Sequence, residues 1–241
     1  MRTLLLALFC AGGLAGAAAA ANNDLVELGV GARLLFNADV YAADNPGVDY
    51  ATDVFPIVGD EAFGLGLNVA LGHRFDSRRG PYEVLVKYYY STGSEDSGTR
   101  AVGGSTPATY DIVGTLDQHD LLMSFRLPGE LMPVPVLNYH DFYYDLGMGV
   151  TTLSYKFDRS NATTGALLES SRRTRSGLAF NVGAGWRHAL SENTALTLRA
   201  DFVLGKIQDV KDASGQVVQL SPNAHGARFQ LGLVRYFRSL F

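Results

Sequence analysis

The chain has 241 residues, the size of one all-β domain, and its 20 basic and 24 acidic residues give a formal net charge of −4. Nucleic-acid-binding domains carry clustered excess lysine and arginine, so this balance argues against that class. The mean hydropathy of +0.05 is far too low for a helical membrane protein. In contrast, 27 glycines, 12 tyrosines and 13 phenylalanines are typical of a β-barrel of which only alternate residues face lipid.

The first 21 residues predict a cleaved export signal. Arg2 supplies the basic start, an apolar stretch begins at Leu4, and small residues from Ala17 to Ala21 fit a cleavage site. The alternative is an uncleaved membrane helix, but no stop-transfer charge follows. We therefore predict a signal peptide at 1–21, export through the Sec pathway, and a mature domain at 22–241. The single cysteine, Cys10, lies in the signal, so disulfides and cysteine-based metal sites are excluded from the mature domain.

Behind the signal, apolar residues alternate strictly with small or charged ones. Val26, Leu28 and Val30 share one face of the first such segment, while Glu27 and Arg33 share the other. The same pattern recurs in eight segments, at 26–36, 63–74, 82–90, 120–127, 141–150, 178–187, 196–204 and from 227 to the C-terminus. Apolar side chains facing lipid and polar ones facing a lumen are typical of a transmembrane β-barrel, so we predict an all-β, eight-stranded antiparallel up-and-down transmembrane barrel.

The connections support this count because short and long ones alternate, as periplasmic turns and outer loops do in such barrels. Short turns lie at 76–80 and 190–193, and the connection at 128–137 is proline-rich and somewhat longer. Long segments lie at 38–60, 92–116, 158–175 and 207–224, and we expect them to be surface loops. A ten-stranded barrel stays open as an alternative, with an additional hairpin at 49–58.

Aromatic residues give a further check on the strand order. If it is correct, six of them face outward at the periplasmic strand ends, where an interfacial girdle belongs: Phe75, Tyr82, Phe125, Phe142, Trp186 and Phe237. A soluble barrel with a ligand cavity would instead hold these rings inside. Arg235 interrupts the outward face of the last strand, so the sequence predicts either a snorkelling side chain or a β-bulge there.

Taken together, the signal, the eight strands, the long loops and the aromatic-ended last strand make the chain resemble the small outer-membrane barrels typified by the OmpA transmembrane domain, OmpX, the opacity proteins and OmpW. The resemblance covers the whole mature chain and rests on architecture. It implies an outer-membrane location in lipid and lipopolysaccharide, a monomer, and the barrel-assembly machinery and periplasmic chaperones as partners during biogenesis. It also implies an assembly signal at Phe237 or Phe241, although Ser239 stands where an apolar residue is usual.

An eight-stranded barrel has a lumen that side chains fill, so its inward charges determine whether it conducts. The alternation places twelve charged residues inside: Glu27, Arg33, Arg74, Glu83, Lys87, Asp120, Arg126, Asp141, Asp145, Arg187, Arg199 and Asp201. Neighbouring strands alternate in sign at the periplasmic end. Because buried charges persist when they are paired, we predict an ion-pair network that plugs the lumen. The alternative is a gated or selective path through rearranging pairs.

The sequence predicts no catalytic, cofactor-binding or metal-ligating residues. His119 lies beside Asp120 and four residues before Ser124, but alternation places it on the opposite strand face from both, so a catalytic triad fails geometrically. The loop at 38–60 carries aspartates without a basic residue. The loop at 158–175 carries Arg172, Arg173 and Arg175, which we interpret as possible contacts for lipopolysaccharide phosphates.

From these observations we predict a non-enzymatic outer-membrane barrel with a charge-plugged lumen and long surface loops for recognition or envelope interaction. The first alternative is a narrow channel for small or apolar molecules, as in OmpW-like barrels. The second is a lipid-modifying enzyme of the outer membrane.

Overall fold

The computed structural model describes residues 23–36, 61–77, 80–102, 108–129, 141–207, 210–211, 217–219 and 225–238. The predicted signal peptide at 1–21, the acidic loop at 38–60 and Phe241 lie outside these residues. Within them, no helix has the length and hydrophobicity that a membrane crossing requires.

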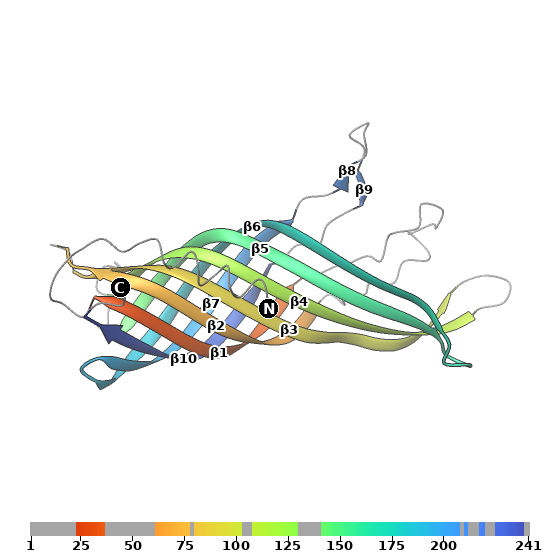
Figure 1. Cartoon of the computed structure of the whole chain (residues 1–241), viewed down its shortest axis with the longest axis horizontal. Helices are drawn as coiled ribbons and strands as arrows, with labels where there is room; N and C mark the ends of the chain where they lie inside the picture. The colour runs from red at the N-terminus through yellow and green to blue at the C-terminus, as the bar shows by residue number, and fades with distance from the viewer. Residues whose placement is uncertain are drawn as a thin grey trace.

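Eight strands close into one antiparallel barrel in the order β1-β10-β7-β6-β5-β4-β3-β2, which confirms the predicted fold class and strand count (Figure 1). The barrel strands are β1 (Asp24–Phe36), β2 (Glu61–Phe75), β3 (Tyr82–Val102), β4 (Ala108–Pro128), β5 (Phe142–Asn161), β6 (Leu167–Ser191), β7 (Thr194–Ile207) and β10 (His225–Phe237). Two short strands, β8 (Val210–Lys211) and β9 (Val217–Gln219), pair only with each other outside the barrel. The hairpin of the ten-stranded alternative, at 49–58, lies outside the described residues.

Burial alternates along the barrel strands as the sequence pattern predicts. Along β1, Glu27 and Arg33 are buried, whereas the outward side chains Leu28 and Val30 are more than half exposed. The barrel therefore carries its polar side chains inside and an apolar surface outside, which is stable where lipid rather than water covers that surface.

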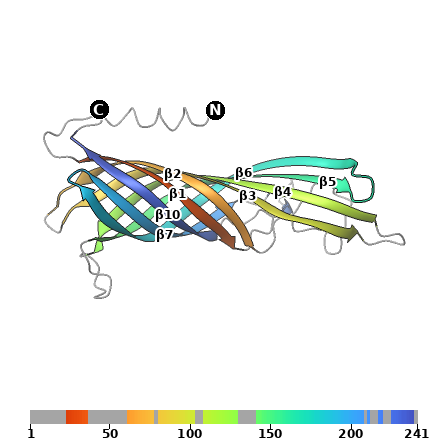
Figure 2. The same cartoon turned by 90° about the horizontal axis from the view of Figure 1, so that it is seen from below.

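The middle strands continue beyond the point where the barrel closes. Pairing of β2 with β3 reaches only Thr92, and pairing of β7 with β6 reaches only Gly177, whereas β3–β4 and β5–β6 pairing runs on to residues 102 and 167. The four strands β3 to β6 leave the barrel together as a projecting sheet, here called the extension, made of residues 93–102, 108–116, 152–161 and 167–176 (Figures 1 and 2).

The extension corrects the expectation that 92–116 and 158–175 are loops, since most of these residues are paired strand. The sequence test relied on the contrast between a lipid face and a lumen face. Segments of the extension such as 93–100 and 169–176 are polar throughout in sequence, so the alternation of apolar and polar residues does not continue along them.

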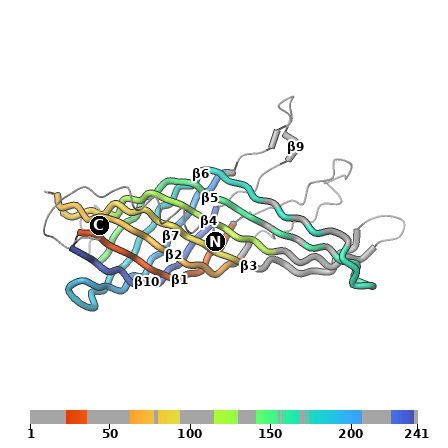
Figure 3. Tube along the Cα trace, viewed as in Figure 1, coloured from red at the N-terminus to blue at the C-terminus, as the bar shows by residue number. Residues whose placement is uncertain are grey.

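Two ends of the barrel can now be distinguished along the tilted strands of Figure 3. The turn end holds Asp24, Phe237 and the short connections, and the extension end holds the extension. Arg235 lies at the turn end, where β10 pairs with β1 and β7 without a register shift, so no bulge forms there. Its exposed guanidinium lies 5.5 Å from the centre of the Phe237 ring, as expected for a snorkelling side chain.

Candidate functional site

The barrel interior contains most of the charged residues that alternation directs inward. Nine of the twelve are almost fully buried: Glu27, Arg33, Glu83, Lys87, Asp120, Arg126, Asp145, Arg199 and Asp201. The side chain of Arg187 is 22% exposed and that of Arg74 is 40% exposed, so these two lie at the mouth of the turn end. The interior is thus a polar core in place of a hydrophobic one.

Arg126 on β4 is the centre of the interior at the turn end. Its Nη2 lies 2.8 Å from Oε2 of Glu27, its Nη1 lies 3.2 Å from Oε2 of Glu83, and its Nε lies 3.5 Å from Oδ2 of Asp145. The guanidinium also stacks 4.3 Å from the centre of the Tyr143 ring. One cation therefore joins carboxylates from β1, β3 and β5 across the lumen.

Arg199 on β7 contacts two of these carboxylates and one further carboxylate, that of Asp201. It lies 3.4 Å from Glu27, 3.7 Å from Asp145 and 3.0 Å from Asp201. Lys87 completes the group with an ion pair of 2.5 Å to Asp145. Because every carboxylate contacts at least one cation, the desolvation cost of these charges is offset by pairing.

A second group lies nearer the extension end. Arg228 on β10 pairs with Asp120 at 2.7 Å and stacks 4.5 Å from the centre of the Tyr89 ring. Gln118 donates to Asp120 at 2.9 Å and accepts from Arg33 at 3.2 Å. Sequence reasoning missed Arg228 and Gln118, although alternation places both on inward faces.

Several residues of the charge ring predicted at the turn end have described contacts there. Arg187 binds Glu83 through two hydrogen bonds of 2.9 and 3.0 Å, and the hydroxyl of Tyr236 donates to the same carboxylate at 2.8 Å. Arg74 instead faces Asp76 at 3.8 Å. Asp141 meets Arg187 through its backbone carbonyl, which accepts the amide N–H at 2.8 Å.

Buried apolar side chains flank the charged groups at both ends. Four of them form a cluster at the turn end: Leu25, Leu85, Ala195 and Val234. Four others, buried to at least 98%, face inward toward the extension end: Leu35, Leu116, Leu153 and Val203. Water-excluding residues therefore occupy part of the lumen on either side of the ion pairs.

Glycines on the inward faces make room for the large interior side chains. A Cβ added to Gly185 would lie 2.8 Å from Cε1 of Tyr143, and the three atoms nearest to that Cβ all belong to the Tyr143 side chain. The ring that carries the Arg126 stack thus fits against β6 only because residue 185 has no side chain.

The predicted girdle residues lie on the outer surface at the turn end. Phe75 stacks on Tyr82 with ring centres 5.2 Å apart, and Trp186 stacks on His188 at 5.3 Å. Phe142 is the cross-strand neighbour of Trp186, and Phe125 is 45% exposed. Phe237 lies under Arg235 at the end of β10.

The described histidines form no hydrolytic triad. His119 points outward, where its Nδ1 lies 2.8 Å from the hydroxyl of Tyr88, while Asp120 on the same strand is buried inside. His73 pairs with Asp24 at 2.6 Å on the outer surface of the turn end. Among the described residues, no group of three histidine, cysteine, aspartate or glutamate side chains is placed to hold a metal ion.

The extension begins where the outward side chains of β5 and β6 change from apolar to polar. Val150 and Leu178 are the last exposed apolar pair, and the next rows are Thr152–Ser176, with hydroxyl oxygens 2.8 Å apart, and Ser154–Thr174, at 3.1 Å. Lys156 and Arg172 follow as an exposed cross-strand pair. Arg172 is one of the three arginines predicted as lipopolysaccharide contacts. Of the other two, Arg175 is half-buried, and the side chain of Arg173 is not among those the structure describes.

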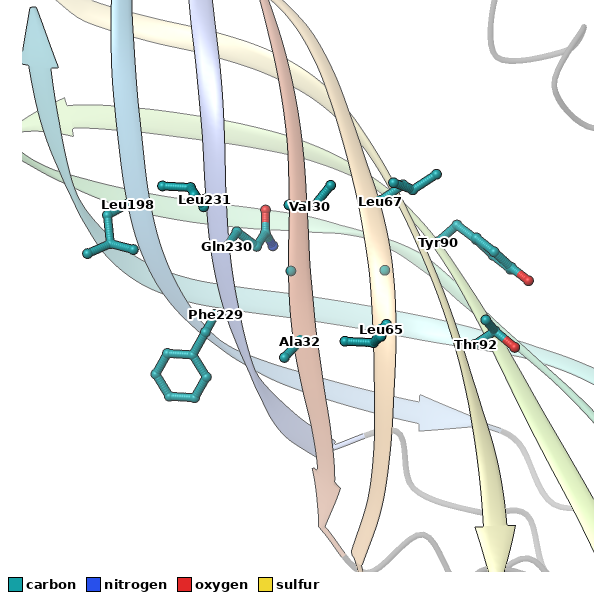
Figure 4. A pocket seen from close by; sticks show the side chains of 12 residues that line it. Val30, Ala32, Leu65, Leu67, Tyr90, Thr92, Leu198, Phe229, Gln230 and Leu231 are labelled. Atoms are coloured by element: carbon teal, nitrogen blue, oxygen red, sulfur yellow. The ribbon is translucent and has the colours of Figure 1, made fainter.

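A groove of about 720 Å³ crosses the outer surface of β10, β1, β2 and β3 (Figure 4). The short side chain of Ala32 forms the floor of the groove. Its cross-strand neighbours Phe229 and Leu65 are exposed and form the two sides. Tyr90 and Thr92 of β3 close it on the side of the extension. The groove is therefore apolar at its floor and polar at one border.

Comparisons with known proteins agree with this architecture. The family model described as outer membrane protein beta-barrel domain matches residues 6–237. No curated protein matches the chain. Among solved structures, the chain matches the attachment invasion locus protein Ail of Yersinia pestis, with 11% identity over 89% of this chain and 97% of Ail and a TM-score of 0.42. OprG of Pseudomonas aeruginosa shares 14% identity over 90% and 97% of the two chains with a TM-score of 0.41, and the protease OmpT of Escherichia coli shares 10% over 92% and 99% with a TM-score of 0.43.

Proposed function

Because the chain belongs to the family of outer membrane protein beta-barrel domains, we propose that it is a non-enzymatic, non-conducting barrel that holds the extension outside the cell as a recognition surface. The resemblance to small outer-membrane barrels is confirmed by the same family match. The proposal keeps the orientation that the sequence predicts, with the turn end in the periplasm, and it assigns the recognition role to the extension.

The recognition role rests on the structure of the extension. The extension is a continuation of four barrel strands, so it is anchored by the same ladders that close the barrel. Within the described residues, its outer strands β3 and β6 each have one edge without a paired strand beyond Thr92 and Gly177. Unpaired edges and a polar face are the features by which a sheet binds an extended segment of another protein.

The packed interior supports a non-conducting barrel. The buried ion pairs around Arg126 and Arg199 fill the lumen, and apolar side chains flank them at both ends. A non-enzymatic role is supported by His119, whose ring contacts tyrosines on the outer surface rather than a nucleophile.

The orientation is tested by cysteine labelling in intact cells, since the predicted mature chain has no thiol. Thr164 lies exposed at the β5–β6 tip and Glu192 lies exposed in the β6–β7 turn. We expect a membrane-impermeant maleimide to label Thr164→Cys in intact cells, and Glu192→Cys only after the outer membrane is permeabilised. Labelling of Glu192→Cys alone in intact cells would reverse the orientation.

Recognition is tested by shortening the β5–β6 part of the extension. Replacing residues 157–171 with an Asn-Gly turn keeps the register of β5 and β6 at Ser154 and Thr174. We expect bacteria that display the full chain to adhere to an epithelial cell monolayer. Bacteria that display the shortened chain should adhere no more than the same strain without this protein. Equal adhesion by both strains, with equal amounts of folded barrel, would contradict the recognition role.

A further inference from the structure

The cross-strand rows that cross the groove continue onto the polar base of the extension. One outward row runs Val30–Leu67–Tyr90–His119–Thr152–Ser176, and the next runs Ala32–Leu65–Thr92–Asp117–Ser154–Thr174. Both rows are apolar on β1 and β2 and polar from β3 onward. A single surface therefore changes from apolar to polar along the direction of the rows.

These rows also climb toward the extension end because the strands of a closed barrel are tilted. The first row can be followed the other way from Val30 through Leu231 and Leu198 to Trp186 on β6. It leaves β6 at Trp186 and returns to β6 at Ser176, ten residues closer to the extension end. The apolar part thus lies deep in the barrel wall, and the polar part lies where that wall ends.

The polar part of the rows holds groups that suit a saccharide. The hydroxyl of Tyr90 donates to Asp117 at 3.3 Å, and the ring of His119 lies 5.0 Å from that of Tyr90. Thr92 is exposed beside them. Carboxylates and hydroxyls exchange hydrogen bonds with sugar hydroxyls, and aromatic faces cover the apolar faces of sugar rings.

A cationic pair lies in the row that follows. Thr115 is the neighbour of Lys156, which is the neighbour of Arg172, and both cations are exposed. Lys156 forms an ion pair with Asp158 at 2.8 Å. Arginine and lysine are the side chains that bind phosphate most strongly.

We propose that this surface binds a phosphorylated, acylated saccharide of the outer leaflet, namely the lipid A part of lipopolysaccharide. An acyl chain lies in the groove over Ala32, the sugar contacts Tyr90, Thr92 and Asp117, and phosphate contacts Lys156 and Arg172. The order of apolar groove, hydroxyl and aromatic rows, and cations matches the order of groups in this class of lipid. The inference rests on the proposed orientation, which places the extension end in the outer leaflet.

The test measures binding of purified lipid A to the folded protein in detergent by native mass spectrometry. Ala32→Phe fills the floor of the groove, and Ala184→Phe places the same ring on the outward face of β6, away from the groove, as the matched control. We expect Ala32→Phe to weaken lipid A binding by about tenfold or more, and Ala184→Phe to change it by less than about twofold.

The phosphate contacts are tested separately with Lys156→Gln/Arg172→Gln, which alters only the extension. We expect about a tenfold loss of affinity for bisphosphorylated lipid A and no loss for dephosphorylated lipid A. The proposal is overturned if Ala32→Phe and Ala184→Phe bind lipid A equally, or if phosphatidylglycerol binds as tightly as lipid A. Neither measurement depends on cell adhesion. A negative result would therefore refute lipid A binding and leave the recognition role to the adhesion assay.

Discussion

Arg126 is the residue on which the interior charge balance at the turn end depends, since it contacts Glu27, Glu83 and Asp145. Replacing it with alanine leaves these carboxylates with fewer cations in a water-poor interior. We expect Arg126→Ala to lower the free energy of unfolding by about 3–5 kcal/mol. The measurement is urea unfolding in detergent, followed by fluorescence of the single tryptophan, Trp186.

The control for that experiment removes one charge of each sign. Arg126→Met combined with Glu27→Gln keeps similar volume and lowers the number of unpaired carboxylates. We expect the double variant to be more stable than Arg126→Ala. An unchanged urea midpoint for Arg126→Ala would show that the pairs contribute nothing to stability.

Gly185 tests the packing of the same centre from β6, the strand paired with that of Tyr143. A methyl group at this position meets the Tyr143 ring, so Gly185→Ala forces that ring away from Arg126. We expect a loss of about 1–3 kcal/mol in the free energy of unfolding. Adding Tyr143→Ala removes the clash, so the effect of Gly185→Ala is expected to be smaller in that background; an equal effect in both would contradict the assigned contact.

Asp158 is a residue of the extension that competes with any anion for Lys156. Hydrogen bonds from Lys156, at 2.8 Å, and from Ser170, at 2.6 Å, hold the pKa of its carboxyl below the usual value, so it stays ionised at neutral pH. We expect Asp158→Asn to free Lys156 and to raise the affinity for bisphosphorylated lipid A by roughly threefold. Binding of dephosphorylated lipid A serves as the control, and equal gains for both lipids would refute the competition.

At the scale of the strands, the extension and the barrel should respond differently to the same substitution. Lys156 lies in the part of β5 that pairs with both β4 and β6, so proline there removes a ladder hydrogen bond of the extension. We expect Lys156→Pro to leave the barrel folded, with its heat-dependent shift in gel mobility intact, while trypsin cleaves the extension. Met148→Pro makes the same change inside the barrel wall and is expected to abolish the mobility shift; loss of the shift in both variants would mean that barrel and extension fold as one unit.

The strand pattern also shows what the sequence can and cannot predict. Within the barrel wall, one face of each strand contacts lipid and the other faces the polar lumen. Alternation therefore identified all eight barrel strands and their inward faces. It missed residues 93–102 and 167–176, because the sequences GSEDSGTRAV and LLESSRRTRS lack a regular alternation of apolar and polar residues. The interior partners were also beyond reach, because Arg126 meets Glu27 and Glu83 across the lumen through side-chain directions that a linear pattern does not contain.

At the scale of the whole molecule, conduction depends on the full cross-section of the lumen rather than on one ion pair. Loss of Arg126 opens space only at the turn end, while Leu35, Leu116 and Leu153 stay buried toward the extension end. We therefore expect Arg126→Ala, like the unmodified protein, to show background conductance in planar bilayers, although it unfolds more easily. Discrete channel steps in Arg126→Ala alone would identify this ion-pair group as a gate and would favour a conduit over a closed barrel. Apolar side chains at both ends of the lumen and paired charges between them close the barrel at more than one level, because water and ions must cross each of them.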